Sequence, residues 1–259
     1  MEEKFIFFPI AGIERTPRDV GLAYEDIFFT TADGVRLNGW HAPYPGARIT
    51  LLWFHGNAGN ISHRVDGVRL LHDKVKANVF IIDYRGYGRS EGTVSEKGTY
   101  EDARAALRYL RSRKDLDAKN IALFGQSLGA AVATELAAGE NCLALILEAP
   151  FASIRDMARV VFPLLPIGPL LRTRYDVAER IKDVKAPILV LQGERDEVIP
   201  VEQGKKVFAA APPPKEFYAI RGAGHNDTFI VGGNAYFDAV KSFIDRAATG
   251  QIQPAVSPK

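Results

Sequence analysis

Residues 125–129 read Gly-Gln-Ser-Leu-Gly, a serine between two glycines. An apolar run at residues 120–124 precedes this stretch, and an alanine-rich run with helical periodicity follows it. A sharp strand-to-helix turn crowds the backbone, so small residues are needed two positions before and after the displayed side chain. The spacing therefore predicts that Ser127 is a nucleophile. The alternative is that Ser127 is an ordinary helix N-cap.

A serine hydroxyl is a weak nucleophile and needs a base to take its proton. Where such a turn carries a catalytic serine, an acid and then a histidine follow along the chain. His225, in the glycine-rich stretch RGAGHND, is the only histidine after Ser127. His225 is therefore the predicted base, and a surface loop histidine is the alternative.

The acid is expected after an earlier strand, in the stretch LVLQGERDEVIP. This stretch offers Glu194, Asp196 and Glu197. Gly193 can make the turn, and Glu194 lies too close to the strand end. Asp196 is therefore the predicted acid, which would orient the histidine and stabilise the imidazolium. Glu197 is the reserve.

Two backbone N–H groups must hold the negative charge that develops on a carbonyl oxygen during acyl transfer. The N–H of Leu128, directly after the serine, is predicted to be one. The loop HGNAGN at residues 55–60 follows another buried run, and its glycines let the backbone curl. Asn57 is predicted to give the second N–H, with Ala58 as the reserve. His55 is expected to hold the loop.

The candidate residues all follow predicted strands. Buried apolar runs alternate with helical patterns, which indicates an α/β fold with a mostly parallel sheet and helices on both faces. Sites in such sheets lie at the carboxyl ends of the strands. The predicted helices are residues 62–76, 96–113, 128–138 and 235–247. The eight predicted strands are residues 25–31, 35–41, 49–54, 78–83, 120–124, 143–148, 187–192 and 216–220.

The core is expected to comprise residues 25–154 and 183–247, with 1–24 as an N-terminal segment and 248–259 as a disordered tail. Residues 155–182 break the alternation, and Pro163, Pro166 and Pro169 prevent a continuous helix there. We expect a small cap over the sheet. Three apolar residues in or beside it are predicted to contact an acyl chain, or alternatively to pack the cap onto the core: Phe151, Phe162 and Leu165.

The chain has 259 residues, a formal net charge of +2 and one cysteine, Cys142. This balance predicts no nucleic-acid partner, and one cysteine excludes an internal disulfide. The N-terminus MEEKFIFFPIAG lacks the pattern of a signal peptide, and no apolar run approaches the roughly 20 residues that span a bilayer. We expect a cytoplasmic protein. The sequence leaves open whether Phe5–Ile10 docks on the core, touches a membrane or contacts a partner, and it does not give the oligomeric state.

Five motifs in order, FHGNAGN, DYRGYGRSEG, GQSLGA, GERDEVIP and GAGHND, resemble the α/β-hydrolase superfamily. The resemblance runs from about residue 25 to 247 and implies Ser127, Asp196 and His225 as the catalytic triad. The loop His-Gly-Asn-Ala is similar to that of a subfamily that includes membrane-associated lipid hydrolases and protein depalmitoylases. Many of its members carry an N-terminal membrane anchor, where this chain has FIFFPI. Tyr87 and Arg89, in the second motif, are either substrate contacts or parts of a glycine-rich turn.

These observations predict a serine hydrolase that cleaves carboxylic esters or thioesters of a hydrophobic acyl group through an acyl-enzyme on Ser127. The expected partner is a small-molecule ester or thioester. No cofactor and no metal are expected. Two alternatives stay open: a peptidase or amidase on the same fold, and a non-catalytic protein of this fold that binds a ligand.

Overall fold

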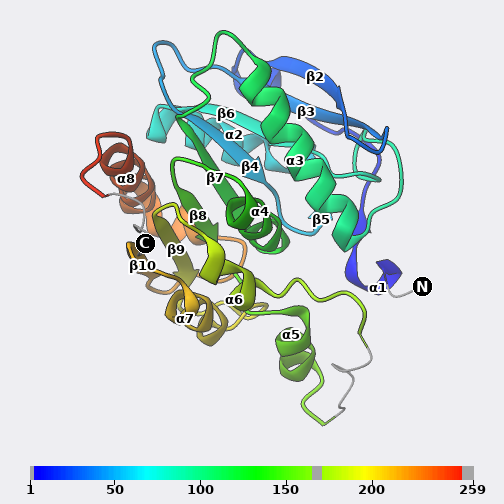
Figure 1. Cartoon of the computed structure of the whole chain (residues 1–259), viewed down its shortest axis with the longest axis vertical. Helices are drawn as coiled ribbons and strands as arrows, with labels where there is room; N and C mark the ends of the chain where they lie inside the picture. The colour runs from blue at the N-terminus through cyan, green and yellow to red at the C-terminus, as the bar shows by residue number, and fades with distance from the viewer. Residues whose placement is uncertain (1–2, 165–170, 253–259) are drawn as a thin grey trace, which may run out of the picture.

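A single large sheet forms the centre of the molecule (Figure 1). The computed structural model describes residues 3–164 and 171–252. The sheet order is β10-β9-β8-β7-β4-β6-β3-β2. Its eight strands are β2 (Glu25–Thr30), β3 (Arg36–Ala42), β4 (Thr50–Phe54), β6 (Asn78–Ile82), β7 (Ile121–Gln126), β8 (Leu145–Glu148), β9 (Ile188–Gly193) and β10 (Lys215–Ile220).

Six of these strands run parallel, and at one edge β3 is antiparallel both to its neighbour β6 and to β2, the other strand of its hairpin. The predicted fold class, with eight strands in a mostly parallel sheet, is thus confirmed. All residues of β4 and β6 are buried because helices cover both faces. The carboxyl ends of the central strands therefore meet at one edge, where the predicted site residues follow.

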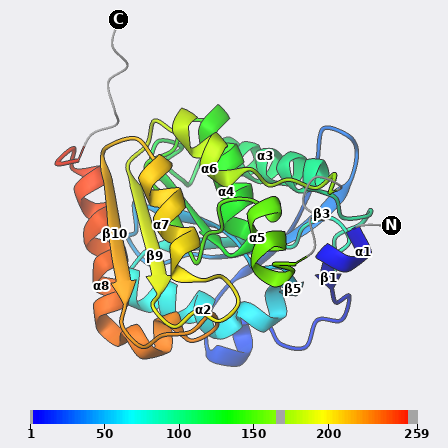
Figure 2. The ribbon, with the colours of Figure 1, turned by 90° about the horizontal axis from the view of Figure 1, so that it is seen from below.

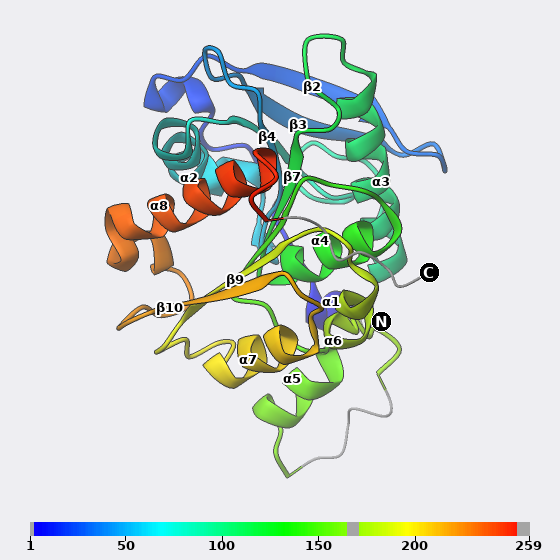
Figure 3. The ribbon, with the colours of Figure 1, turned by 60° about the vertical axis from the view of Figure 1, so that its left-hand side comes forward.

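The helices divide between the two faces of the sheet (Figure 3). One face packs against α3 (Glu96–Ser112), α4 (Leu128–Gly139), α6 (Val177–Arg180) and α7 (Val201–Ala210). The other face packs against α2 (Val65–Leu70) and α8 (Thr228–Ala248). A 3₁₀ turn, Ile61–Arg64, precedes α2 and a π-helical turn, Leu71–Val75, follows it. A kink at Gly233 divides α8, so the predicted helix 235–247 is its second part.

Two longer helices, α7 and α5 (Ile154–Val161), were not expected from the sequence, and neither were the four-residue helices α1 (Glu3–Ile6) and α6. In α7, Gly204 interrupts the helical pattern of the sequence. A glycine is needed at this position because a Cβ would lie 2.5 Å from the Gln192 side chain. The other longer helix, α5, lies in the proline-containing region, begins at the N-cap Ser153 and ends before Pro163. In the described part of this region a short helix thus precedes the prolines, and residues 162–164 do not continue it.

The N-terminal segment docks on the core and does not stand apart from it. After α1 (Glu3–Ile6), the strand β1 (Phe8–Pro9) pairs in parallel with β5 (Ala58–Gly59), as Figure 2 also shows. Phe7 is buried, and its ring meets that of Tyr175 edge-on. Asn60 donates from its side chain to the carbonyls of Ile10 and Gly12. The segment therefore braces residues 55–60.

Within the described residues, no helix is both long enough and apolar enough to cross a bilayer.

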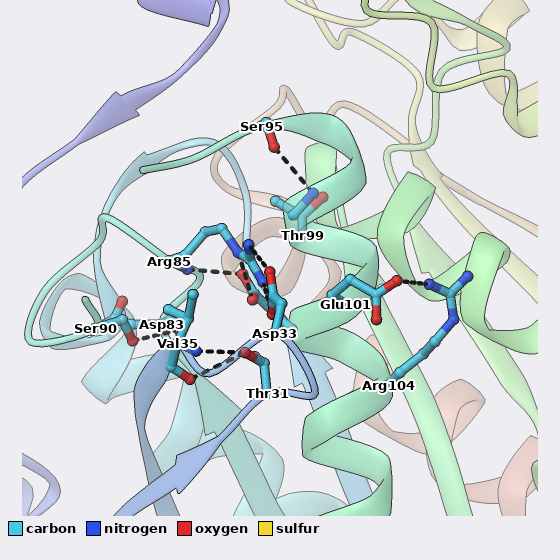
Figure 4. Close-up of polar contacts among 12 residues, drawn as sticks. Thr31, Asp33, Val35, Asp83, Arg85, Ser90, Ser95, Thr99, Glu101 and Arg104 are labelled. Carbon is cyan, nitrogen blue, oxygen red and sulfur yellow. Dashed lines mark hydrogen bonds and ion pairs between the residues drawn. The ribbon is translucent and has the colours of Figure 1, made fainter. Parts of the chain in front are cut away.

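The loop after β6 is fixed by a buried charged group (Figure 4). The Arg85 guanidinium donates to Asp102 of α3 at 2.9 Å and to Asp33 of the β2–β3 turn at 2.8 Å. The Asp83 carbonyl accepts from the Ser90 hydroxyl at 2.8 Å. Asp102 is fully buried, whereas the Asp33 side chain is 46% exposed. These contacts join three separate segments beside the site.

Asp102→Ala should lower the free energy of unfolding by about 3–5 kcal/mol, because it leaves the nearly buried Arg85 without its buried partner. Asp33→Ala is the matched control, and its loss should stay below about 1 kcal/mol because that carboxylate is half exposed. Urea unfolding of both variants measures the difference. Equal losses would contradict this assignment of the buried partner.

Candidate functional site

Ser127 lies at the sharp turn between β7 and α4. Its φ of 54° and ψ of −117° fall in a region that residues with a side chain rarely adopt. A Cβ at Gly125 would overlap the Gly129 carbonyl, and one at Gly129 would overlap the Phe54 carbonyl. Both glycines of the G-x-S-x-G pattern are thus required by close backbone contacts. The strain at Ser127 is of the kind found at functional sites.

The geometry of Ser127 differs from that of the N-cap serines in this protein. Ser95 and Ser153 are extended, and their side chains accept hydrogen bonds from the N–H groups of Gly98 and Asp156. Ser127 occupies the corresponding position of α4 but makes no such bond. The N-cap alternative therefore does not explain this residue.

His225 and Asp196 contact each other in the loops after β10 and β9. Nδ1 of His225 lies 2.8 Å from an oxygen of Asp196. The other Asp196 oxygen accepts from the backbone N–H groups of Val198 and Ile199 at 3.0 and 2.7 Å. These bonds stabilise the carboxylate and fix its direction. Asp196 is buried, whereas the two other acids considered from the sequence, Glu194 and Glu197, are exposed.

Ser127 and His225 line the same cavity, which has a volume of about 500 Å³. Trp53 and Phe124 of the central strands also line it, and residues of α2 and α8 form opposite walls. No hydrogen bond joins Ser127 to His225 in the part of the chain that the structure describes. Such bonds are often long before a substrate binds. The roles of these residues in catalysis stay predictions.

Residues 55–60 approach the serine turn closely. A Cβ on Gly56 would lie 3.5 Å from the Cβ of Ser127. Asn57 and Ala58 line the cavity. Leu128 begins α4, and the first N–H groups of a helix have no partner within it. Leu128 thus follows the serine directly and Asn57 lines the same cavity, and their role in holding an oxyanion stays a prediction.

The Asn57 side chain binds the protein itself. Its amide donates to the Ile6 carbonyl, and its oxygen accepts from the Tyr87 hydroxyl at 3.0 Å and from the Phe8 N–H at 3.3 Å. Tyr87 is therefore a support for the loop and does not line the cavity. Arg89, the other candidate of that motif, pairs with Asp26.

His55 is fully buried and holds the loop, as expected. Its Nδ1 contacts the Gly56 carbonyl at 2.6 Å, and its Nε2 lies 3.5 Å from Asp83. Tyr84 donates its hydroxyl to the His55 carbonyl at 2.9 Å. Burial raises the pKa of Tyr84 well above its usual value, so this hydroxyl stays a donor.

Phe151 and Phe162, the two predicted acyl-contacting residues that the structure describes, do not line the cavity. Phe151 is buried in the hydrophobic core, and Phe162 is exposed at the end of α5. Leu165 lies outside the described residues. The cavity opens between α2 and α8, whereas α5 and α6 lie toward the other face of the sheet (Figure 3). The expected contribution of Phe151 and Phe162 is therefore not supported.

Three charged residues of the cavity wall, Glu148, Arg64 and Asp66, were missed in the sequence. Glu148 ends β8 and is buried, and it accepts from Thr228 at 2.5 Å, Tyr236 at 2.6 Å and Gln126 at 3.2 Å. Burial beside Glu148 raises the pKa of Tyr236 well above its usual value. The sequence feature that could have identified Glu148 is its position at the end of a buried apolar run. Arg64, at the start of α2, carries no comparable signal because basic residues are common on helices.

Sequence comparison finds relatives over nearly the whole chain. An uncharacterized protein of Mycobacterium tuberculosis is 39% identical over 249 residues, covering 95% of this chain and 88% of the relative. The α/β-hydrolase domain-containing protein WAV2 of Arabidopsis thaliana is 37% identical, with the same coverage. Protein bem46 of Schizosaccharomyces pombe is 38% identical over 88% of this chain and 79% of that protein.

Comparison with solved structures gives the same fold. An esterase of Pyrococcus furiosus superposes with a TM-score of 0.77 at 24% identity, covering 92% of this chain and 98% of that chain. The family model described as the α/β-hydrolase fold matches residues 49–168, which contain the 55–60 loop and the Ser127 turn. With these matches and an eight-stranded, mostly parallel sheet, the chain belongs to the α/β-hydrolase superfamily.

Proposed function

We propose that the protein is a serine hydrolase that cleaves ester or thioester bonds of substrates with a hydrophobic acyl group. The observation that carries this proposal is the strained Ser127 in one cavity with His225, whose Nδ1 lies 2.8 Å from the buried Asp196. The esterase with the same fold adds support. Because residues 55–58 read His-Gly-Asn-Ala, we also propose that the protein belongs to the subfamily with this loop sequence.

The proposed reaction is a two-step acyl transfer. Because Nδ1 of His225 binds Asp196, Nε2 is left to take the proton as the Ser127 oxygen attacks the carbonyl carbon. The N–H groups of Leu128 and Asn57 hold the oxyanion. The alcohol or thiol leaves with the proton from His225. Water, activated by the same histidine, then releases the acid and restores Ser127.

The acyl group is assigned to the cavity between α2 and α8. Its apolar lining includes Trp53, Leu70, Phe124, Phe229 and Phe237. A cavity of this size and composition is typical of small-molecule sites. The hydrophobic effect, worth about 0.8 kcal/mol for each buried CH₂, then favours longer acyl chains.

Wild type should react with a fluorophosphonate probe, whereas Ser127→Ala and His225→Ala should not, because the probe needs an activated serine. Ser153→Ala is the matched control, since this serine caps α5 and should leave labelling unchanged. Mass spectrometry of the labelled peptide locates the site. Labelling of Ser127→Ala at the wild-type rate would reject Ser127 as the nucleophile.

Asp196→Asn should lower kcat by about 10³- to 10⁴-fold, because the amide no longer stabilises the imidazolium or holds the correct tautomer. Glu197→Gln, next to it and exposed, should change kcat by less than about twofold. Hydrolysis of 4-nitrophenyl esters measures both. A large loss in Glu197→Gln alone would assign the acid to that reserve position.

The kcat/KM for 4-nitrophenyl octanoate should exceed that for the acetate by at least about tenfold, because the cavity buries the longer chain. Phe229→Ala, in the cavity wall, should reduce this preference. Phe162→Ala, exposed on α5, should leave it unchanged. The reverse pattern would place the acyl chain under the predicted cap.

A further inference from the structure

One cation in the cavity wall has no carboxylate partner within the described part of the chain. Arg64 ends the 3₁₀ turn before α2 and lines the cavity together with Ser127 and His225. Its Nη2 donates to the Ala58 carbonyl at 2.7 Å. Its Nε is buried and has no hydrogen-bond partner among residues 3–164 and 171–252, and the same residues supply no ion pair to it.

The other titratable side chains of the cavity wall all have partners. They are Asp66 with Arg15 at 2.9 Å, His63 with the N–H of Asn60 at 3.1 Å, His225 with Asp196, and Glu148 with Thr228, Tyr236 and Gln126. Each of these charges or dipoles is therefore compensated within the protein. Arg64 alone, among the described lining residues, faces the cavity with only a neutral carbonyl bound.

Burial lowers the pKa of Arg64 from its usual value, while Asp83, Tyr84 and Glu148 nearby act in the opposite direction. An arginine keeps its charge in proteins at neutral pH. A partly desolvated guanidinium attracts an oxyanion more strongly than one in water does, because fewer water molecules screen it. The remaining wall near it is apolar, through Leu70, Leu71 and Phe229.

We propose that Arg64 forms a binding subsite for an anionic group of the substrate. The substrates are then esters or thioesters that carry a carboxylate or a phosphate group in addition to an apolar portion. This inference rests on the proposed function, because its first test measures ester hydrolysis. The planar fork of a guanidinium matches both anions with two parallel hydrogen bonds. Nη1 of Arg64 makes no hydrogen bond to the described residues and is not among the buried atoms, so it is one donor available for such a pair.

The first test compares acyl groups that differ only in charge at their far end. The 4-nitrophenyl half-esters of glutaric, adipic and suberic acid are compared with 4-nitrophenyl esters of the neutral monoacids of equal carbon number. In the wild type, at least one half-ester should have the higher kcat/KM of its pair. Arg64→Met should lower that ratio by about 10- to 100-fold, as expected when a charge-assisted pair is lost.

Two further variants separate the subsite from a structural effect. Arg64→Lys keeps the charge but not the fork, and it should give an intermediate ratio. Arg69→Met is the matched control, because Arg69 is exposed on α2 and lies 3.6 Å from Asp73. It should leave the ratio unchanged. If Arg64→Met slows both esters of a pair equally, or if the wild type prefers the neutral ester at every length, the subsite is rejected.

Direct binding tests the subsite even if the protein hydrolyses nothing. Absence of both fluorophosphonate labelling and ester hydrolysis in the wild type would reject the proposed function alone. Monomethyl adipate and butyl phosphate are then titrated calorimetrically into Ser127→Ala and into Ser127→Ala with Arg64→Met. Binding that disappears with Arg64→Met supports the subsite, and the tighter ligand identifies carboxylate or phosphate. Binding of neither ligand to Ser127→Ala overturns the proposal.

Discussion

The close backbone contact between Gly129 and Phe54 is the constraint on which the geometry around Ser127 depends. Because α4 starts this near to β4, the chain must reverse over a single residue, and Ser127 adopts φ 54° there. The Ser127 N–H donates to the Glu148 carbonyl at 2.8 Å, which ties the turn to β8. Strands on both sides of β7 therefore hold the turn through backbone atoms, and the serine side chain is left to face the cavity.

A second group of contacts holds the 55–60 loop opposite this turn. Only two residues of the loop join a strand pairing, so its shape depends on side chains. Asn57 and Asn60 bind backbone groups of residues 6–12, and Tyr87 binds Asn57 from the loop fixed by Arg85. The N-terminal segment, whose docking on the core the sequence left open, is thus part of the support for the site. Contacts between side chains and a backbone some 50 residues away leave no periodic pattern from which to predict them.

The parts of the site that could be predicted follow from strand ends and local spacing. Ser127, Asp196 and His225 each follow a predicted strand, and the parallel sheet brings those strand ends together. The side of the sheet that carries the cavity could not be predicted. In β4, Leu52 and Phe54 face one side while Leu51 and Trp53 face the other, and all four are apolar and buried. A strand that is apolar on both faces gives no signal for the face on which a cavity opens.

Glu148 and Arg64, two of the charged wall residues that the sequence did not single out, have different physical explanations. Glu148 receives donors from Gln126 on β7 and from two residues of α8, so its burial fixes the start of the helix that carries Phe229 and Phe237 into the cavity wall. That explains Glu148 as a structural residue. The same explanation fails for Arg64, because burying a charge is unfavourable unless the charge is paired. The described chain gives the Arg64 guanidinium one neutral acceptor, the Ala58 carbonyl, and its Nε has no acceptor. A neutral residue could brace the loop at Ala58 without this penalty, so the cation is best explained by an anion that enters the cavity.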